Sequence, residues 1–262
     1  MIPATPKHSG DARGNRSSVT RAQDEDDRTP SAVWLGLLWL GMILGFGVDF
    51  HRFLHEHPSA PRILYVHAIV FTGWMLLLTA QVLLVLGDRI AWHRKLGWFL
   101  AGRACLMVIL GPWGVMASQA AALGTPFSDP PFLSDNITSM VSFVVILAWG
   151  IALRKNPAAH RRLMILTTVA ICDPGFGRFS QFLWPNEPHS VIVWFFYSFY
   201  GNVLLVTLMA AWDLWRGRLI RSFVFAASGM LAAEAAASML YFWPPWKAVT
   251  LSWVQVWATH FA

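Results

Sequence analysis

Two related stretches decide the fold of this chain: DRIAWHRKLG at residues 88–97 and RKNPAAHRRLM at residues 154–164. In each stretch a basic segment ends one apolar run, presents a His-Arg pair and begins the next apolar run. The histidines of the two copies, His93 and His160, lie 67 positions apart. That separation is about the length of two membrane helices with their loops. The sequence is therefore organised around two similar basic turns.

The composition is that of a membrane protein with several helical spans. Of 262 residues, 56% are hydrophobic and 13% are charged, and the mean hydropathy is +0.48. A soluble domain carries about 25% charged residues, whereas apolar runs near the roughly 20 residues needed to cross a bilayer recur here. The runs are continuous rather than alternating, which argues against a transmembrane β-barrel. The predicted fold class is all-α, a polytopic membrane helical bundle.

We expect residues 32–242 to form a domain of about seven transmembrane helices. Residues 1–31 are polar and predict a disordered cytoplasmic tail, and residues 243–262 predict an interfacial tail. Helices two and three and helices four and five read as a parallel repeat. In the fifth span, Asp173-Pro174-Gly175 is expected to break the helix. The expected spans are 32–50, 61–86, 97–121, 136–153, 162–183, 190–212 and 220–242.

Lys and Arg residues predict the orientation of the bundle. They concentrate in the loops after the second, fourth and sixth spans, whereas the alternate loops hold only Arg52 and Arg62. Because cytoplasmic loops carry an excess of Lys and Arg, the three basic loops are expected in the cytoplasm. The prediction is a multi-pass protein of the cell (inner) membrane with the N-terminus inside and the C-terminus outside. The +6 net charge comes mostly from these loops and predicts no nucleic-acid partner.

The sequence assigns no reaction. Its two cysteines lie inside apolar runs and no CxxC or CxxCH motif occurs, which argues against covalent haem attachment and a Cys-rich zinc site. No metal site is predicted. No P-loop, G-x-S-x-G or dinucleotide motif occurs either, so no catalytic residue is proposed.

Ionisable residues inside the expected spans mark a candidate ligand pocket, because such groups are expensive in a bilayer and face the bundle interior. Helical rise places several at a similar depth in the outer half of the bilayer. They can wall a pocket or form a buried ion pair and hydrogen bonds that fix helix packing, and both alternatives stay open. Gln81 shares the inward face of the second span with His67 and Trp74. The pocket candidates are His67, Asp173, Arg178, Tyr200, Glu234 and Gln81.

The two His-Arg turns have three interpretations. His93 and His160 could simply begin the third and fifth helices at wet positions. Two neutral imidazoles on neighbouring helices could instead hold a haem iron axially. The adjacent Arg94, Arg161 and Arg162 could bind lipid headgroups or another anion.

The chain resembles a group of multi-pass bacterial membrane proteins that has no settled activity. The resemblance covers about residues 61–180 and rests on His67, Trp74 and Gln81, on HRKLG at 93–97, on HRRLM at 160–164 and on Arg178 downstream. The chain is also remotely similar to transmembrane four-helix haem b cytochromes, which bind haem between histidines of neighbouring helices. That similarity implies haem b as a cofactor of helices two to five.

Three functions follow as hypotheses. The first is redox or haem handling by the four-helix core, with His67, His93 and His160 as candidate ligands. The second is a small-solute or proton-linked transporter or sensor that uses the outer pocket. The third is a scaffold or assembly factor without a ligand. We favour the first, with the lipid bilayer and a small-molecule ligand as the expected partners, and leave the oligomeric state open.

Overall fold

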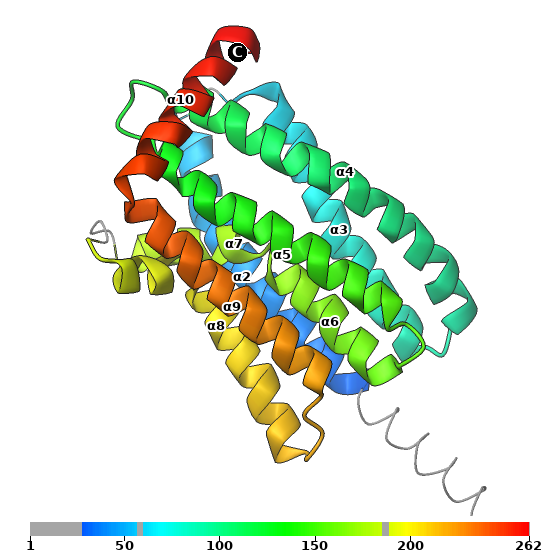
Figure 1. Ribbon diagram of the computed structural model, residues 1–262. Coiled ribbons are helices and arrows are strands. Elements are labelled where there is room, and N and C mark those ends of the chain that lie inside the picture. Colours follow the sequence, from blue (N-terminus) through cyan, green and yellow to red (C-terminus); the bar gives the residue numbers. More distant parts are fainter. Residues whose placement is uncertain (1–27, 57–59, 185–188, 262) are drawn as a thin grey trace, which may run out of the picture.

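The structure is a computed structural model that describes residues 28–56, 60–184 and 189–261, and in this part of the chain it is all-helical. Of the predicted disordered tail at residues 1–31, residues 1–27 lie outside the described residues, and residues 28–31 are the first residues of α2. The helices pack side by side as one bundle (Figure 1). Their bounds are α2 Arg28–Glu56, α3 Arg62–Leu86, α4 Ile90–Ala122, α5 Leu133–Ala152, α6 Pro157–Val169, α7 Asp173–Leu183, α8 Val191–Trp215, α9 Arg221–Phe242 and α10 Pro244–Phe261, with a 3₁₀ turn, η1, at Pro130–Phe132.

Six helices of the described chain are long and apolar enough to cross a membrane, which confirms the predicted class of membrane helical bundle. They correspond to six of the seven expected spans. The fifth expected span is different, because residues 162–183 fall into two shorter helices, α6 and α7. The C-terminal segment forms a further helix, α10, which packs against α4 and η1.

The predicted break in the fifth span occurs just before Asp173. α6 ends at Val169, and the backbone then tightens to bonds between residues three apart, from Cys172 N–H to the carbonyl of Val169 (3.1 Å). Pro174, in the first turn of α7, lacks an N–H and so cannot continue the ladder of α6. The sequence therefore predicts both the existence and the place of this interruption.

Close packing of glycines holds α7 between α2 and α8. A Cβ atom at Gly45 of α2 would overlap the backbone carbonyl of Gly175, and one at Gly201 of α8 would overlap the Phe176 ring. Small residues let helix backbones approach in a membrane, where such packing rather than the hydrophobic effect drives association. Residues Gly41 and Gly45 form a small-xxx-small pair on the face of α2 that receives α7.

α6 is the central helix of the bundle. It packs against α2, α5, α8 and α9, and Leu163, Leu166 and Val169 are fully buried. Its hydroxyls bond within the protein, as Thr167 does to the carbonyl of Leu163 at 2.8 Å. Asn156 caps its first turn by accepting from a backbone N–H, an arrangement that favours a helix start at Pro157.

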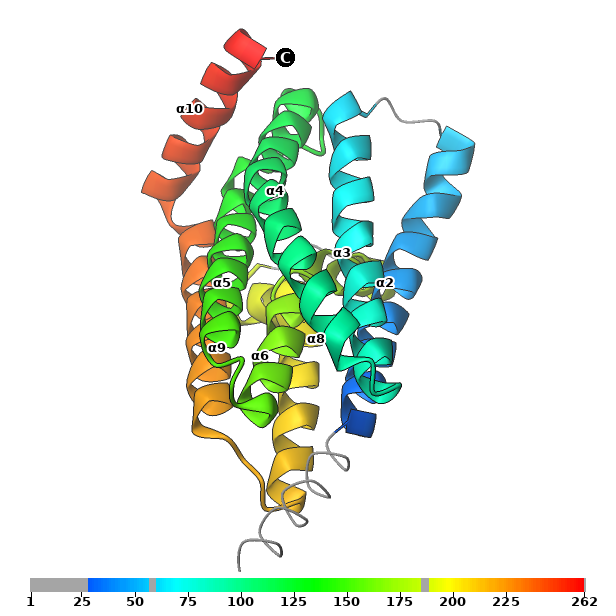
Figure 2. The same cartoon turned by 90° about the vertical axis from the view of Figure 1, so that its right-hand side faces the viewer.

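Three basic turns of the bundle lie at one end. Figure 2 shows the α3–α4, α5–α6 and α8–α9 turns together at the lower end, where α2 also begins. The His-Arg motifs follow two of these turns, α3–α4 and α5–α6, in the first residues of α4 and α6. The hairpin α3–α4 therefore stands beside the hairpin α5–α6 with the two motifs facing each other.

Candidate functional site: a histidine-lined cavity between two hairpins

A cavity of about 710 Å³ opens between the hairpin α3–α4 and the hairpin α5–α6, at the end that carries the basic turns. Its lining comes from α3, α4, α5 and α6, with one residue, Ser31, from α2. These are the four helices expected to form the core of a haem site. Drug-sized and cofactor-sized ligands occupy cavities of roughly 300–1,000 Å³, so this cavity is large enough for a cofactor.

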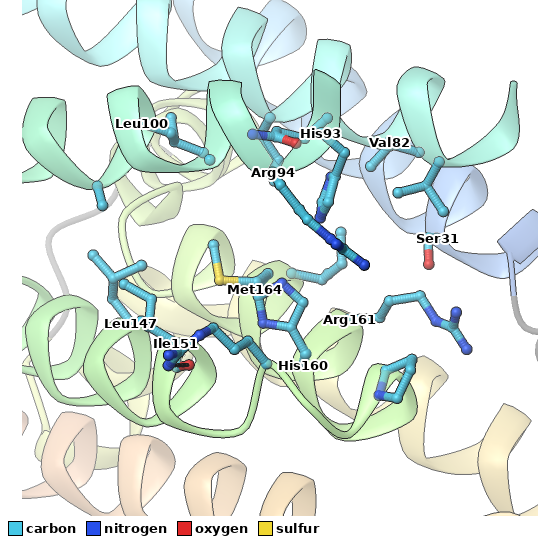
Figure 3. Close-up of a pocket in the computed structure, with 18 of the residues that line it drawn as sticks. Ser31, Val82, His93, Arg94, Leu100, Leu147, Ile151, His160, Arg161 and Met164 are labelled. Atoms are coloured by element: carbon cyan, nitrogen blue, oxygen red, sulfur yellow. Dashed lines mark hydrogen bonds between the residues drawn. The ribbon is translucent and has the colours of Figure 1, made fainter. Parts of the chain in front are cut away.

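The two motif histidines face each other across the cavity (Figure 3). Their ring centres are 6.3 Å apart and their planes are inclined at 81°. α4 begins at Ile90 and α6 at Pro157, so each histidine is the fourth residue of its helix. Both rings therefore lie one helical turn inside the bundle, deeper than the helix starts expected from the sequence.

Hydrogen bonding fixes the tautomer of His160. Its Nδ1 lies 2.8 Å from the carbonyl oxygen of Gly150, on α5. A carbonyl can only accept, so Nδ1 carries the proton, and Nε2 of the neutral ring keeps its lone pair. This is the arrangement by which proteins orient a metal-ligating histidine. His93 has no such support, since its buried Nδ1 has no hydrogen-bond partner among the described residues.

Gln81 lines the same cavity and lacks partners for its amide. Its side chain is only 5% exposed, yet neither the amide nitrogen nor the amide oxygen has a hydrogen-bond partner within the described chain. A buried amide left unbonded costs about 1–3 kcal/mol. A Cβ atom at Gly97 of α4 would lie 3.5 Å from the amide nitrogen, so the glycine leaves open space beside it. The unpaired amide is a donor and acceptor that a ligand in the cavity could satisfy.

The deep wall of the cavity is apolar and held in place. Trp74 is fully buried, its indole N–H donates to Thr168 Oγ1 at 3.1 Å, and its ring packs edge-on against Phe143. Leu100 and Leu147 lie beside it on α4 and α5. The inner part of the cavity is therefore lined by apolar side chains.

The outer rim of the cavity is cationic. Arg94 and Arg161 come from the His-Arg motifs, and Arg154 and Lys155 from the α5–α6 turn. The residues that line the cavity include no Asp or Glu. In Figure 3 the labelled Arg94 and Arg161 side chains extend to one side of the histidine rings, and Leu100 and Leu147 lie on the other. The cavity is therefore graded from charged rim to apolar interior.

Arg162, the second arginine of the HRRL motif, is not part of the cavity. Its guanidinium forms a two-point ion pair with Asp213 of α8, through Nε to Oδ2 at 2.5 Å and Nη2 to Oδ1 at 2.7 Å. Both side chains are buried. The pair ties α6 to α8. Sequence analysis missed Asp213, although a single carboxylate near the inner end of a span was a signal for such a pair.

His67 does not join the other two candidate haem ligands. It does not line the cavity; its Nδ1 donates to the carbonyl of Leu110 at 3.2 Å, and its ring stacks on Phe71 with centres 4.0 Å apart. Gly114 of α4 makes room for the ring. His67 thus links α3 to α4, and the structure brings together two of the three candidates.

Two of the proposed outer-pocket residues, Asp173 and Arg178, do not line the cavity and contact other side chains and backbone of the bundle. Asp173 Oδ2 accepts from Ser139 Oγ at 2.9 Å. Arg178 Nη1 donates to the carbonyl of Pro174 at 2.9 Å, and its guanidinium lies 4.5 Å from the centre of the Phe46 ring. These contacts fix α7 against α5 and α2.

Tyr200 and Glu234 are likewise engaged in packing. Tyr200 meets Phe176 edge to face, with ring centres 5.8 Å apart. Glu234 is fully buried, and its Oε1 accepts from Asn202 Nδ2 at 2.7 Å. Of the residues grouped with them from the sequence, Gln81 belongs to the histidine-lined cavity instead.

A further buried carboxylate, Asp135, was missed because the fourth span was expected to begin at residue 136. α5 begins earlier, at Leu133. Asp135 Oδ2 accepts from the indole N–H of Trp194 at 3.1 Å, and Oδ1 accepts from Ser134 Oγ at 3.2 Å. Asp135, Asp173 and Glu234 thus form a set of buried carboxylates around the start of α7.

No known protein family, no curated protein and no solved structure matches the chain. The site therefore has to be interpreted from its own geometry.

Proposed function

We propose that this chain is an integral protein of the bacterial inner membrane that binds haem b between His93 and His160 and carries single electrons. The observation that carries the proposal is the 6.3 Å separation of the two imidazole centres across a cofactor-sized cavity. The same four helices, α3 to α6, supply the cavity and both rings.

The ring separation is compatible with two imidazoles that hold one metal ion. A metal–imidazole bond is about 2 Å long, and the ring centre lies about 1 Å beyond the nitrogen, so two imidazoles that share an ion would have centres roughly 6 Å apart. His160 is prepared for this role, because its Nδ1 proton is committed to Gly150 and its Nε2 lone pair is available. His93 is hydrogen-bonded to the backbone of Gln81, and its buried Nδ1 has no partner among the described residues, so a ligand in the cavity would give that nitrogen a partner.

The other lining residues support binding of a large planar cofactor. Trp74, Leu100 and Leu147 provide an apolar wall that would shield a bound planar cofactor from water. Bound haem supplies a one-electron ferric/ferrous couple. His67 lies outside the cavity, and the proposed ligand set is therefore His93 and His160 alone.

The orientation expected from the basic turns completes the proposal. The cavity opens at the end where Lys and Arg concentrate, and such turns favour the cytoplasmic side. We infer that the N-terminus is cytoplasmic, the C-terminus is outside, and the haem lies near the cytoplasmic surface.

An absorption spectrum of the detergent-purified protein, expressed with ample haem, tests the proposal. The expected result is a Soret band with sharp α and β bands on reduction, the low-spin pattern of two nitrogen ligands. His93→Ala and His160→Ala should each abolish that low-spin pattern. His67→Ala is the matched control and should keep it. Absence of a Soret band in the unmodified protein would refute haem binding.

Proton-linked transport is a second candidate, favoured by one observation. Asp135, Asp173 and Glu234 are buried around the broken α6–α7 segment, and broken helices with buried carboxylates are typical of ion-coupled sites. Proteoliposomes with an entrapped pH dye and a potassium diffusion potential test this candidate. If Asp135→Asn and Asp173→Asn leave the rate of proton entry unchanged, the candidate is rejected.

A further inference from the structure

We propose that Arg94, Arg154, Lys155 and Arg161 form a carboxylate subsite that binds the two propionates of the haem, so that the macrocycle enters edge-on with its apolar edge toward Trp74. This inference rests on the proposed function and adds the direction of the ligand and the groups that select it.

The cavity has an uneven distribution of charge. Four of its lining residues are Arg or Lys, and no lining residue is acidic. Arg binds carboxylates through paired hydrogen bonds, so these side chains would stabilise a carboxylate bound at the rim.

The lining changes in character with depth in the cavity. On α4 the sequence runs from Arg94 at the rim to Leu100, about 9 Å deeper at 1.5 Å per residue. On α5, Leu147 lies about 6 Å deeper than Ile151, and Arg154 lies beyond the end of this helix, in the α5–α6 turn at the rim. His93 and His160 lie between rim and wall. The cavity therefore matches a ligand with anionic groups on one edge, a metal at its centre and an apolar opposite edge.

Gln81 also lines the cavity. Its side chain is 95% buried, and neither amide atom has a partner among the described residues. A buried amide is normally hydrogen-bonded. The unpaired amide of Gln81 therefore supports a ligand that enters the cavity, rather than an anion that binds only to the basic residues at its rim.

The test compares haem with its dimethyl ester, in which both carboxylates are blocked, by titration of the full-length apoprotein in detergent. The unmodified protein is expected to bind haem about tenfold more tightly than the ester. Arg94→Gln/Arg154→Gln should lose most of that preference and still give the low-spin spectrum with both compounds. Lys95→Gln is the matched control, because Lys95 follows Arg94 directly but does not line the cavity, and it should keep the preference.

The outcomes separate the two proposals. Equal affinity of the unmodified protein for haem and ester, with a low-spin spectrum for both, would overturn the carboxylate subsite and leave the histidine site standing. Failure of both compounds to bind, with anionic phospholipid found on the purified protein by mass spectrometry, would overturn both. Because the comparison of the two compounds on unmodified protein needs no substitution, the test does not depend on whether the variant folds.

Discussion

The Arg162–Asp213 pair should be the most sensitive polar contact in the bundle. Asp213→Asn removes the charge that faces the buried guanidinium but keeps the volume of the side chain. The guanidinium then remains buried with two weakened hydrogen bonds of 2.5 and 2.7 Å. Hydrogen bonds to charged groups contribute about 1.5–3 kcal/mol each, and breaking one partner of a buried pair costs about 3–5 kcal/mol. We expect a loss of about 3–5 kcal/mol in the free energy of unfolding.

The assay is equilibrium unfolding in mixed micelles, with the SDS mole fraction as the denaturing variable and a double-mutant cycle as the design. Asp213→Leu/Arg162→Met should recover most of the loss, because replacing both charges by apolar groups of similar size is often neutral or stabilising. Lys95→Met, at an exposed position outside the pair, is the control and should change stability by less than about 0.5 kcal/mol. A cost below about 1 kcal/mol for Asp213→Asn would refute the reasoning.

Substitutions at three further sites, Gly45, Asn156 and Glu234, test packing in the broken span and between α8 and α9. Gly45→Val should destabilise the fold by about 2–4 kcal/mol because its side chain would overlap the backbone of Gly175, whereas Gly47→Val on the same helix, with nothing within 4 Å, should be nearly neutral in the same unfolding assay. Asn156→Ala should cost about 1 kcal/mol by removing the cap of α6, and an unchanged unfolding midpoint would count against the cap. Glu234→Gln, which keeps an acceptor oxygen, should cost less than about 1 kcal/mol, and Glu234→Leu about 1–3 kcal/mol; equal losses would argue that the hydrogen bond contributes nothing.

Much of the fold was predictable because helix signals in this chain are local. Apolar runs locate the long helices, and Asp173-Pro174 ends the continuity of the fifth span. The start of α6 was expected at residue 162 and lies at Pro157, although Asn156-Pro157 is a local signal for a helix start. The paired histidines were also predictable, because a repeat of 67 positions returns the chain to the same end of the bundle.

The remaining parts of the site were not predictable because they depend on the rotation of each helix. Depth estimates place His67 near Arg178 in the bilayer, but they do not say which neighbour a side chain faces, and His67 turns toward Leu110 of α4 instead. In the same way, the sequence HRRL does not reveal that Arg161 faces the cavity and Arg162 faces Asp213. Adjacent side chains on a helix point about 100° apart, and only the packed structure determines which of them faces which neighbour.

The interrupted span also has a consequence for how the chain enters the membrane during synthesis. α6 has 13 residues and α7 has 11, about 20 and 17 Å of helix at 1.5 Å per residue, and each is shorter than a hydrocarbon core of roughly 30 Å. Neither helix is stable in lipid by itself, because the N–H and C=O groups at its ends would lie in hydrocarbon without hydrogen-bond partners. The helices that pack around α6 and α7 are α2 and α5, which are synthesised earlier, and α8 and α9, which are synthesised later. The centre of the molecule is therefore the last part to assemble, although it is neither the first nor the last part to be translated.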